Sequence, residues 1–241
     1  MKALTEVRVG CCGFPVSRKA YYSKFAVVEV QQTFYQPPQP STLKRWRQEA
    51  PEDFEFTLKA WQLITHEASS PTYRRLRLDL SDKQGREVGS LKWTDTTRFA
   101  WEKTLEAAKI LAANKIIFQC PASFKPTDEN KDNIRRFFSE IDRSDLTLIW
   151  EPRGNWQDHE IAEICKELRL VHCVDPFKTQ TVTKGLCYFR LHGIGGYRHS
   201  YSETELRQLA GWAMDRKPAY AMFNNVTMLE DALRFKSLLA Q

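Results

Sequence analysis

Short apolar or β-branched runs alternate with stretches of helical periodicity along the chain. Eight such runs are expected to be strands, at residues 7–10, 26–30, 54–60, 115–119, 146–150, 170–174, 187–191 and 219–223. Alternation of strand and helix patterns is typical of parallel βαβ units, and eight parallel strands are the number that closes a barrel. The pattern therefore predicts an α/β fold: one (β/α)8 TIM-like barrel domain spanning residues 1–241.

Helical periodicity is clear between most of these runs. It predicts helices at residues 41–49, 97–113, 127–141, 202–212 and 229–239, with Ser41, Thr127 and Ser202 near helix starts, where a hydroxyl can cap the first turn. Only a dozen residues separate the sixth run from the seventh, so the helix between them is expected to be short or missing. Residues 67–95, after the third run, are too long and polar for an ordinary βα loop and are predicted to form a lid-like insertion.

Composition places the chain among globular proteins. Hydrophobic residues make up 42% and charged residues 27%, and no apolar run approaches the length of a membrane span. A cytoplasmic protein without a membrane partner is therefore expected. The net charge of +6 comes from the first 120 residues, which hold 19 basic and 13 acidic side chains, whereas the rest hold 17 of each. This excess is compatible with an anionic partner.

Polar side chains follow almost every predicted strand at its carboxyl end, where TIM barrels carry their chemistry. Residues two apart on a strand share a face, which pairs Glu29 with Gln31, Lys59 with Trp61, Glu151 with Arg153, and Arg190 with His192. A pocket at these ends is predicted. Its catalytic candidates are Glu29, Lys59, Glu151 and His192, and its substrate-binding candidates are Gln31, Tyr35, Trp61, Gln119, Arg153, Asp175, Arg190, Tyr197, Asn224 and Asn225.

These residue types favour acid–base chemistry on a small anionic or polyhydroxylated molecule. Arginine and lysine bind phosphate or carboxylate groups, glutamate can carry a proton, and histidine titrates near neutrality. The same pattern also fits a buried ion pair that only supports the barrel. Whether the protein is an enzyme therefore stays open, as do its substrate and reaction class.

Several motifs at the same strand ends resemble the domain of unknown function 72 family, YecE-like. They are Thr33-Phe34-Tyr35, Ile64-Thr65-His66 after Lys59, FQCPASF at 118–124, EPRGNW at 151–156, YFRLHG at 188–193 and FNN at 223–225. The resemblance is collinear from about residue 7 onward. It implies a TIM barrel with a cavity at the strand ends and implies no activity.

The chain departs from the expected family pattern at a few positions. Gln31 stands where the family is expected to have Asn, and Gly154 where it often has His. The first change keeps an amide, whereas the second removes an imidazole. Cys11 and Cys12 occupy positions where Thr or Ser is expected, so cysteine chemistry is not implied for the family.

Three alternatives remain at this stage. Glu151, Asp175 and His192 end consecutive strands and would suit a divalent metal ion, although the nearby arginines oppose a cation. A thiol site would use Cys11, Cys12 and Cys120. A noncatalytic nucleic-acid-binding protein would use the basic residues of the insertion together with tryptophans. The chain has no P-loop or dinucleotide-binding glycine pattern, so no nucleotide cofactor is predicted.

Overall fold

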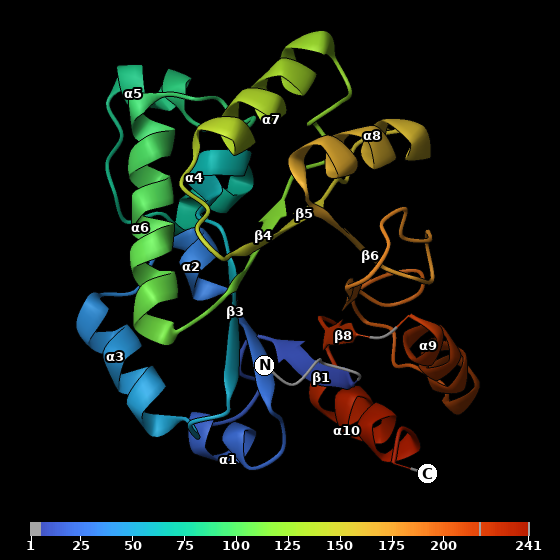
Figure 1. The fold of residues 1–241 in the computed structure, drawn as a ribbon. Coiled ribbons are helices and arrows are strands. Elements are labelled where there is room, and N and C mark those ends of the chain that lie inside the picture. Colours follow the sequence, from blue (N-terminus) through green and yellow to red (C-terminus); the bar gives the residue numbers. More distant parts are fainter. Residues whose placement is uncertain (1–5, 217, 241) are drawn as a thin grey trace. The chain divides into compact units, whose positions relative to one another are not determined.

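All eight predicted strands form in the computed structural model, which describes residues 6–216 and 218–240 (Figure 1). They follow one another in sequence order as a closed parallel barrel, which confirms the predicted fold class. The strands are β1 (Val7–Cys12), β2 (Val27–Val30), β3 (Glu55–Lys59), β4 (Lys115–Gln119), β5 (Thr147–Glu151), β6 (Val171–Val174), β7 (Cys187–Leu191) and β8 (Ala219–Phe223).

Helices occupy the five predicted segments and several others. They are α1 (Arg18–Tyr22), α2 (Gln32–Tyr35), α3 (Pro40–Glu49), α4 (Gln62–Thr65), the 3-10 helix η1 (Pro71–Arg75), α5 (Asp82–Glu87), α6 (Asp95–Leu111), α7 (Asp128–Glu140), α8 (Asp158–Leu168), α9 (Glu203–Asp215) and α10 (Met228–Leu238). Residues 175–186, all described, contain no helix, which confirms the expectation for the connection between β6 and β7. Thr127 and Ser202 cap α7 and α9 as predicted, whereas α3 begins at Pro40, so Ser41 lies inside that helix and is not its cap.

The chain contains two compact units. The terminal unit comprises Met1–Glu29, Glu49–Glu55 and Val171–Gln241, and the central unit comprises Val30–Gln48 and Phe56–Leu170. A single domain stays a prediction. In the described ranges, no helix combines the length and apolarity needed to cross a bilayer.

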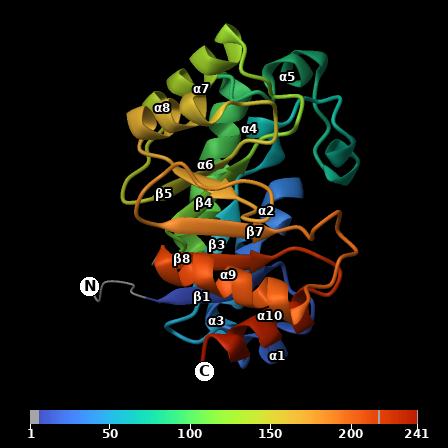
Figure 2. The ribbon, with the colours of Figure 1, turned by 90° about the vertical axis from the view of Figure 1, so that its right-hand side faces the viewer.

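In the terminal unit, β1 lies between β2 and β8, and β7 lies between β6 and β8. Figure 2 shows α9 and α10 side by side, and both helices contact β8, while α10 also contacts β1. The strands are buried because parallel strands covered by helices have no solvated face. Gly10 permits the close approach of β1 to β2, since a Cβ atom at this position would lie 2.4 Å from the carbonyl oxygen of Val27.

In the central unit, β4 lies between β3 and β5, with Gln119 opposite Glu151 in the register. All five residues of β4 are buried. The long helix α6 contacts α4 and α5 (Figure 1). Its start is fixed by a capping box in which Thr94 and Thr97 exchange side-chain to backbone hydrogen bonds.

The predicted insertion is partly ordered by its own helices and by contacts with α4. It contains η1 and α5, and Val88 and Leu91 near its end are fully buried. The backbone N–H groups of Gly89 and Leu91 donate to the carbonyls of Leu63 and Ile64 in α4. The end of the insertion is therefore fastened to the strand-end region of the central unit, and its action as a lid stays a prediction.

Replacing Gly10 with alanine should destabilise the fold. The new methyl group would force β1 away from β2, and overpacking of this kind costs about 1–3 kcal/mol. Urea denaturation would measure the change in the free energy of unfolding. Gly211 in α9 is a matched control, because nothing lies within 4 Å of its Cβ position, so Gly211→Ala should be neutral or stabilising by up to about 1 kcal/mol. Equal effects of the two substitutions would contradict the packing argument.

Candidate functional site

A fully buried ion pair lies among the strands of the terminal unit. Glu29 of β2 and Arg190 of β7 expose 0% and 1% of their side chains. Arg190 donates from Nη2 to Glu29 Oε1 at 2.9 Å and from Nε to Oε2 at 3.1 Å, and the Tyr188 hydroxyl donates to the same Oε2 at 3.0 Å. Three donors on one carboxylate make Glu29 a well-held group, and this geometry fits a supporting role better than proton transfer.

A second polar layer lies next to this pair in the terminal unit. The rings of Tyr188 and Tyr220 stack with centroids 5.4 Å apart, and the Tyr220 hydroxyl donates to Glu55 at 2.8 Å. Glu55 also pairs with Arg8 at 3.4 Å. The buried hydroxyl groups of Tyr188 and Tyr220 thus each donate to a carboxylate, as burial of a polar group requires.

The thiols do not form a reactive centre. All six cysteines are buried and reduced. Burial raises the pKa of Cys11 and of Cys120 to about 12 and raises the pKa of Cys12 well above its usual range, where the Glu29 charge adds to the effect. Because the thiolate is the nucleophile, these groups are unreactive at neutral pH. Cys12 Sγ instead accepts from Arg190 Nη2 at 3.8 Å.

Asp175 and His192 come together where β6 and β7 end. The backbone N–H of His192 donates to Asp175 Oδ2 at 3.2 Å, and that of Phe177 donates to Oδ1 at the same distance. The His192 ring nitrogen Nδ1 lies 3.8 Å from Asp175 Oδ2, and 18% of the His192 side chain is exposed. This imidazole is therefore reachable from solvent, unlike the Glu29–Arg190 pair.

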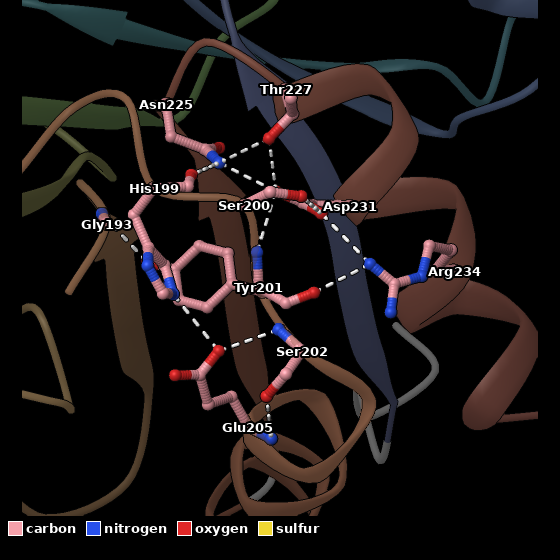
Figure 3. Close-up of polar contacts among 10 residues, drawn as sticks. All are labelled: Gly193, His199, Ser200, Tyr201, Ser202, Glu205, Asn225, Thr227, Asp231 and Arg234. Atoms are coloured by element: carbon pink, nitrogen blue, oxygen red, sulfur yellow. Dashed lines mark hydrogen bonds and ion pairs between the residues drawn. The ribbon is translucent and has the colours of Figure 1, made fainter.

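The two asparagines after β8 have different surroundings. Asn225 is fully buried, and its side-chain N–H groups donate to Asp231 Oδ2 at 2.6 Å and to the carbonyl of His199 at 2.7 Å (Figure 3). Asn224 is half-buried and uses its backbone N–H to continue pairing with Leu191. Asn225 thus takes part in an internal network.

Asp231, which sequence reasoning missed, is the centre of that network. It is fully buried in the first turn of α10 and accepts hydrogen bonds from Thr227 at 2.7 Å and from the backbone N–H of Tyr201 at 3.3 Å (Figure 3). The Tyr201 hydroxyl in turn accepts from the Gly193 N–H at 2.9 Å. These contacts fasten the loop after β7 to α10. Asn225 and Thr227 are only six and four positions from Asp231, whereas Tyr201 is 30 positions away, so the link to the loop after β7 has no local sequence pattern.

In the central unit, Glu151 at the end of β5 connects two predicted residues. Glu151 Oε1 accepts from Gln119 Nε2 at 3.0 Å and from Arg153 Nε at 2.8 Å. The Glu151 side chain is 7% exposed and that of Arg153 is 40% exposed. The structure therefore brings these three residues together, with Arg153 as the member that reaches solvent.

Lys59 and His66 form the other half of this central-unit cluster. Lys59 is buried, and its ammonium lies 3.4 Å from the centroid of the Phe34 ring, a cation–π contact. The His66 ring packs edge-on against the same Phe34, and its Nδ1 is 2.8 Å from the Thr65 hydroxyl. Burial, followed by the charges of Lys59 and Arg153, lowers the pKa of His66 to about 3. We call Lys59, His66, Glu151 and Arg153 the cationic cluster.

The remaining central-unit candidates lie in other surroundings. Gln31 is half-buried at the N-cap of α2. Tyr35 is the last residue of α2. The guanidinium carbon of Arg75 lies over its ring, 4.4 Å from the centroid of the Tyr35 ring. β3 ends at Lys59, so Trp61 is the N-cap of α4, and its ring packs near Phe99 of α6. The alternation of side chains between the two faces of a strand therefore ends at Lys59 and does not place Trp61 on the same face as Lys59.

Tyr197 and Gly154 complete the predicted positions. Tyr197 lies in the loop after β7 and exposes 56% of its surface. Gly154 follows Arg153, and a Cβ atom there would lie 2.3 Å from the carbonyl oxygen of Phe124. That carbonyl already accepts from the Trp156 indole at 2.8 Å. This close backbone contact leaves no room for a histidine side chain at position 154.

No arrangement for a metal ion is found in the part of the chain that the structure describes. Asp175 and His192 lie close together in the terminal unit. Glu151 accepts hydrogen bonds from Gln119 and Arg153 in the central unit. Within residues 6–216 and 218–240, no group of three or more histidine, cysteine or carboxylate side chains is placed to hold an ion.

A family model described as Protein of unknown function DUF72 matches residues 17–241. The chain belongs to this family. No curated protein matches it. Two DUF72 structures are similar: one from Enterococcus faecalis, with 20% identity, a TM-score of 0.74 and coverage of 98% of both chains, and one from Thermotoga maritima, with 21% identity, a TM-score of 0.67 and coverage of 98% of this chain and 99% of that chain.

A further similar structure is described as a xylose isomerase domain containing protein from Salmonella typhimurium. It has 13% identity and a TM-score of 0.58, and the match covers 94% of each chain. At this identity the likeness concerns the fold alone. The description of the DUF72 family states no activity.

Replacing Arg190 with methionine should unfold part of the molecule. The substitution would leave the Glu29 carboxylate buried without its guanidinium, which costs about 3–5 kcal/mol. The free energy of unfolding would be measured by urea denaturation. Arg207→Met is the control, because the Arg207–Glu203 pair is exposed and exposed pairs contribute less than about 1 kcal/mol. Adding Glu29→Gln to Arg190→Met should recover part of the loss; no recovery would contradict the ion-pair argument.

The depressed pKa of His66 predicts a pH dependence of stability. The unfolded imidazole binds a proton below about pH 6.5, whereas the folded one resists protonation down to about pH 3, so stability falls as the pH is lowered through this window. Between pH 7 and pH 5 the wild type should lose about 2 kcal/mol more than His66→Gln. Urea denaturation at both pH values tests this, and equal losses would show that His66 is protonated normally.

Proposed function

We propose that the protein is an enzyme that binds a small anionic substrate at the cationic cluster and acts on it by acid–base chemistry. The observation that carries this proposal is the packing of buried Lys59 and buried His66 against the same Phe34 ring, with Arg153, 40% exposed, in the same cluster. Burial and the charges of Lys59 and Arg153 lower the His66 pKa. A buried imidazole kept neutral beside two cations indicates a positive potential at the ends of β3 and β5. Perturbed groups of this kind gather at functional sites.

The two cations are suited to different parts of anion binding. Arg153 is 40% exposed and held by Glu151 through Nε, so it can meet an incoming phosphate or carboxylate. Lys59 is buried against the Phe34 ring, where a charge acts in a low dielectric and attracts an anion more strongly than in water. A substrate bound there would replace water around both groups.

Proton transfer at this cluster would use Glu151. Its Oε1 accepts from Gln119 and Arg153, an arrangement that orients the carboxylate. The neutral His66 can donate or accept a hydrogen bond at any pH above about 3. In the terminal unit, His192 is a further candidate for proton transfer because it is partly exposed beside Asp175. The fold shared with a xylose isomerase domain containing protein is compatible with a polyhydroxylated substrate but does not select one.

A ligand screen would test the proposal. Melting temperatures of the wild type would be measured with inorganic phosphate, sugar phosphates and hydroxycarboxylates, since a ligand that binds the folded state raises the melting temperature. Arg153→Gln and Lys59→Met should each weaken the binding of any active compound about 10-fold or more, because each removes a charge-assisted contact. Arg136→Gln, an exposed change on α7, is the control and should leave binding unchanged.

If both variants melt at lower temperature yet bind the same compounds with wild-type affinity, Lys59 and Arg153 only support the barrel. A calorimetric titration on each folded variant separates the loss of binding from the loss of stability.

A further inference from the structure

Two adjoining hollows flank the proline-rich segment 36–40 of the central unit. The first, which we call the arginine groove, has a volume of about 770 Å³ and is lined by Tyr35, Trp46, Arg74, Arg75 and Arg77 together with the prolines. The second, the tryptophan cleft, has a volume of about 220 Å³ and is lined by Trp61, Leu78 and Phe99 among others. Both hollows are lined by Gln36, Pro37, Pro38, Gln39 and Arg77, so they adjoin at this segment.

The arginine groove is positively charged. Arg74 and Arg75 belong to η1, Arg77 follows it, and all three are exposed. In the described part of the chain none of them has a carboxylate within ion-pair distance, and no acidic residue lines the groove. Arg75 is oriented by the Tyr35 ring, and the backbone at Arg77 is held by the Gln36 side chain at 3.2 Å. Three guanidinium groups that line one groove without a carboxylate offer donors of the kind that phosphate oxygens accept from.

The tryptophan cleft offers an apolar counterpart. The Trp61 and Phe99 rings lie with centroids 6.0 Å apart, and Leu78 and Phe99 leave 39% and 42% of their surfaces exposed at the cleft. The indole N–H of Trp61 is buried and has no hydrogen-bond partner among the described residues. Buried polar groups without partners are rare in folded proteins, so this donor is an independent sign of a ligand.

We propose that the arginine groove and the tryptophan cleft together bind a phosphorylated aromatic molecule of the nucleotide class. The planar ring packs beside Phe99 in the cleft, and one of its acceptor atoms takes the Trp61 N–H. The phosphate group lies on Arg77, which lines both hollows, and on Arg75, which lines the arginine groove. The rigid prolines keep this surface in shape before binding, which lowers the entropy lost on association. This site is separate from the cationic cluster.

Two sources share this chemistry: a free mononucleotide and the terminal nucleotide of a single strand. Calorimetric titration of the whole protein in about 50 mM salt would use adenosine monophosphate, adenosine, inorganic phosphate and a 5′-phosphorylated oligodeoxyadenylate. Adenosine monophosphate should bind at least about 10-fold more tightly than adenosine or phosphate, because only it occupies both hollows. Tighter binding of the oligonucleotide than of the monophosphate assigns the site to a strand end, and equal binding assigns it to the mononucleotide.

Variants separate the two hollows. Arg75→Gln combined with Arg77→Gln should reduce affinity for adenosine monophosphate to the level of adenosine, and Phe99→Ala should reduce it to the level of phosphate. Trp61→Phe should weaken binding of the monophosphate and of adenosine alike. Arg86→Gln removes the same charge from an exposed position of α5 outside both hollows and should leave affinity unchanged.

Three results would overturn the proposal. The first is the absence of saturable binding of both adenosine monophosphate and the oligonucleotide. The second is an equal loss of affinity in Arg86→Gln and in the double arginine variant, which would indicate a general charge effect. The third is loss of binding in Arg153→Gln with full binding in the double arginine variant, which would place the nucleotide at the cationic cluster instead.

Discussion

The buried pairing of Glu29 with Arg190 is the interaction on which the terminal unit depends. A charge inside a barrel is tolerated only when it is paired and hydrogen-bonded, and here the guanidinium, the carboxylate and the Tyr188 hydroxyl satisfy one another. The pair joins β2 to β7, strands that are distant in sequence. Its burial leaves 0% and 1% of the Glu29 and Arg190 side chains exposed, so neither partner is open to solvent.

The same constraint divides the strand-end residues into two kinds. Glu29 and Arg190 lie within their strands and are covered, whereas Arg153 and His192 follow the ends of their strands and keep part of their surface in water. A difference of one or two positions along the chain therefore separates a supporting residue from a candidate for binding. The cationic cluster contains residues of both kinds: Lys59 is buried, and the Arg153 side chain is 40% exposed.

The sequence is sufficient for the barrel itself. Eight buried parallel strands need apolar side chains on both faces, which produces runs such as 115–119 and 219–223 whose ends match the structure. Helix bounds were less predictable. The four-residue helix α4 was not predicted, and α8 was implied by the barrel but not given bounds, although Ile161, Ile164 and Leu168 recur at helical spacing and are buried. Trp61 was misplaced on the lysine's face because the alternation of strand faces ends at Lys59. The role of Asp231 in joining α10 to the loop after β7 could not be predicted, since Tyr201 is 30 positions away in the sequence.

The hydrogen-bonding of β1 has a consequence for how the polypeptide acquires its fold during translation. β1 takes β8 as one of its two neighbours, and the contact between Cys12 and Met222 spans 210 positions. The backbone groups of β1 that pair with β8 thus have no strand partner until the ribosome has made nearly the whole chain. A nascent chain with such an open strand edge is exposed to mispairing, and it offers a binding target to chaperones until β8 has emerged.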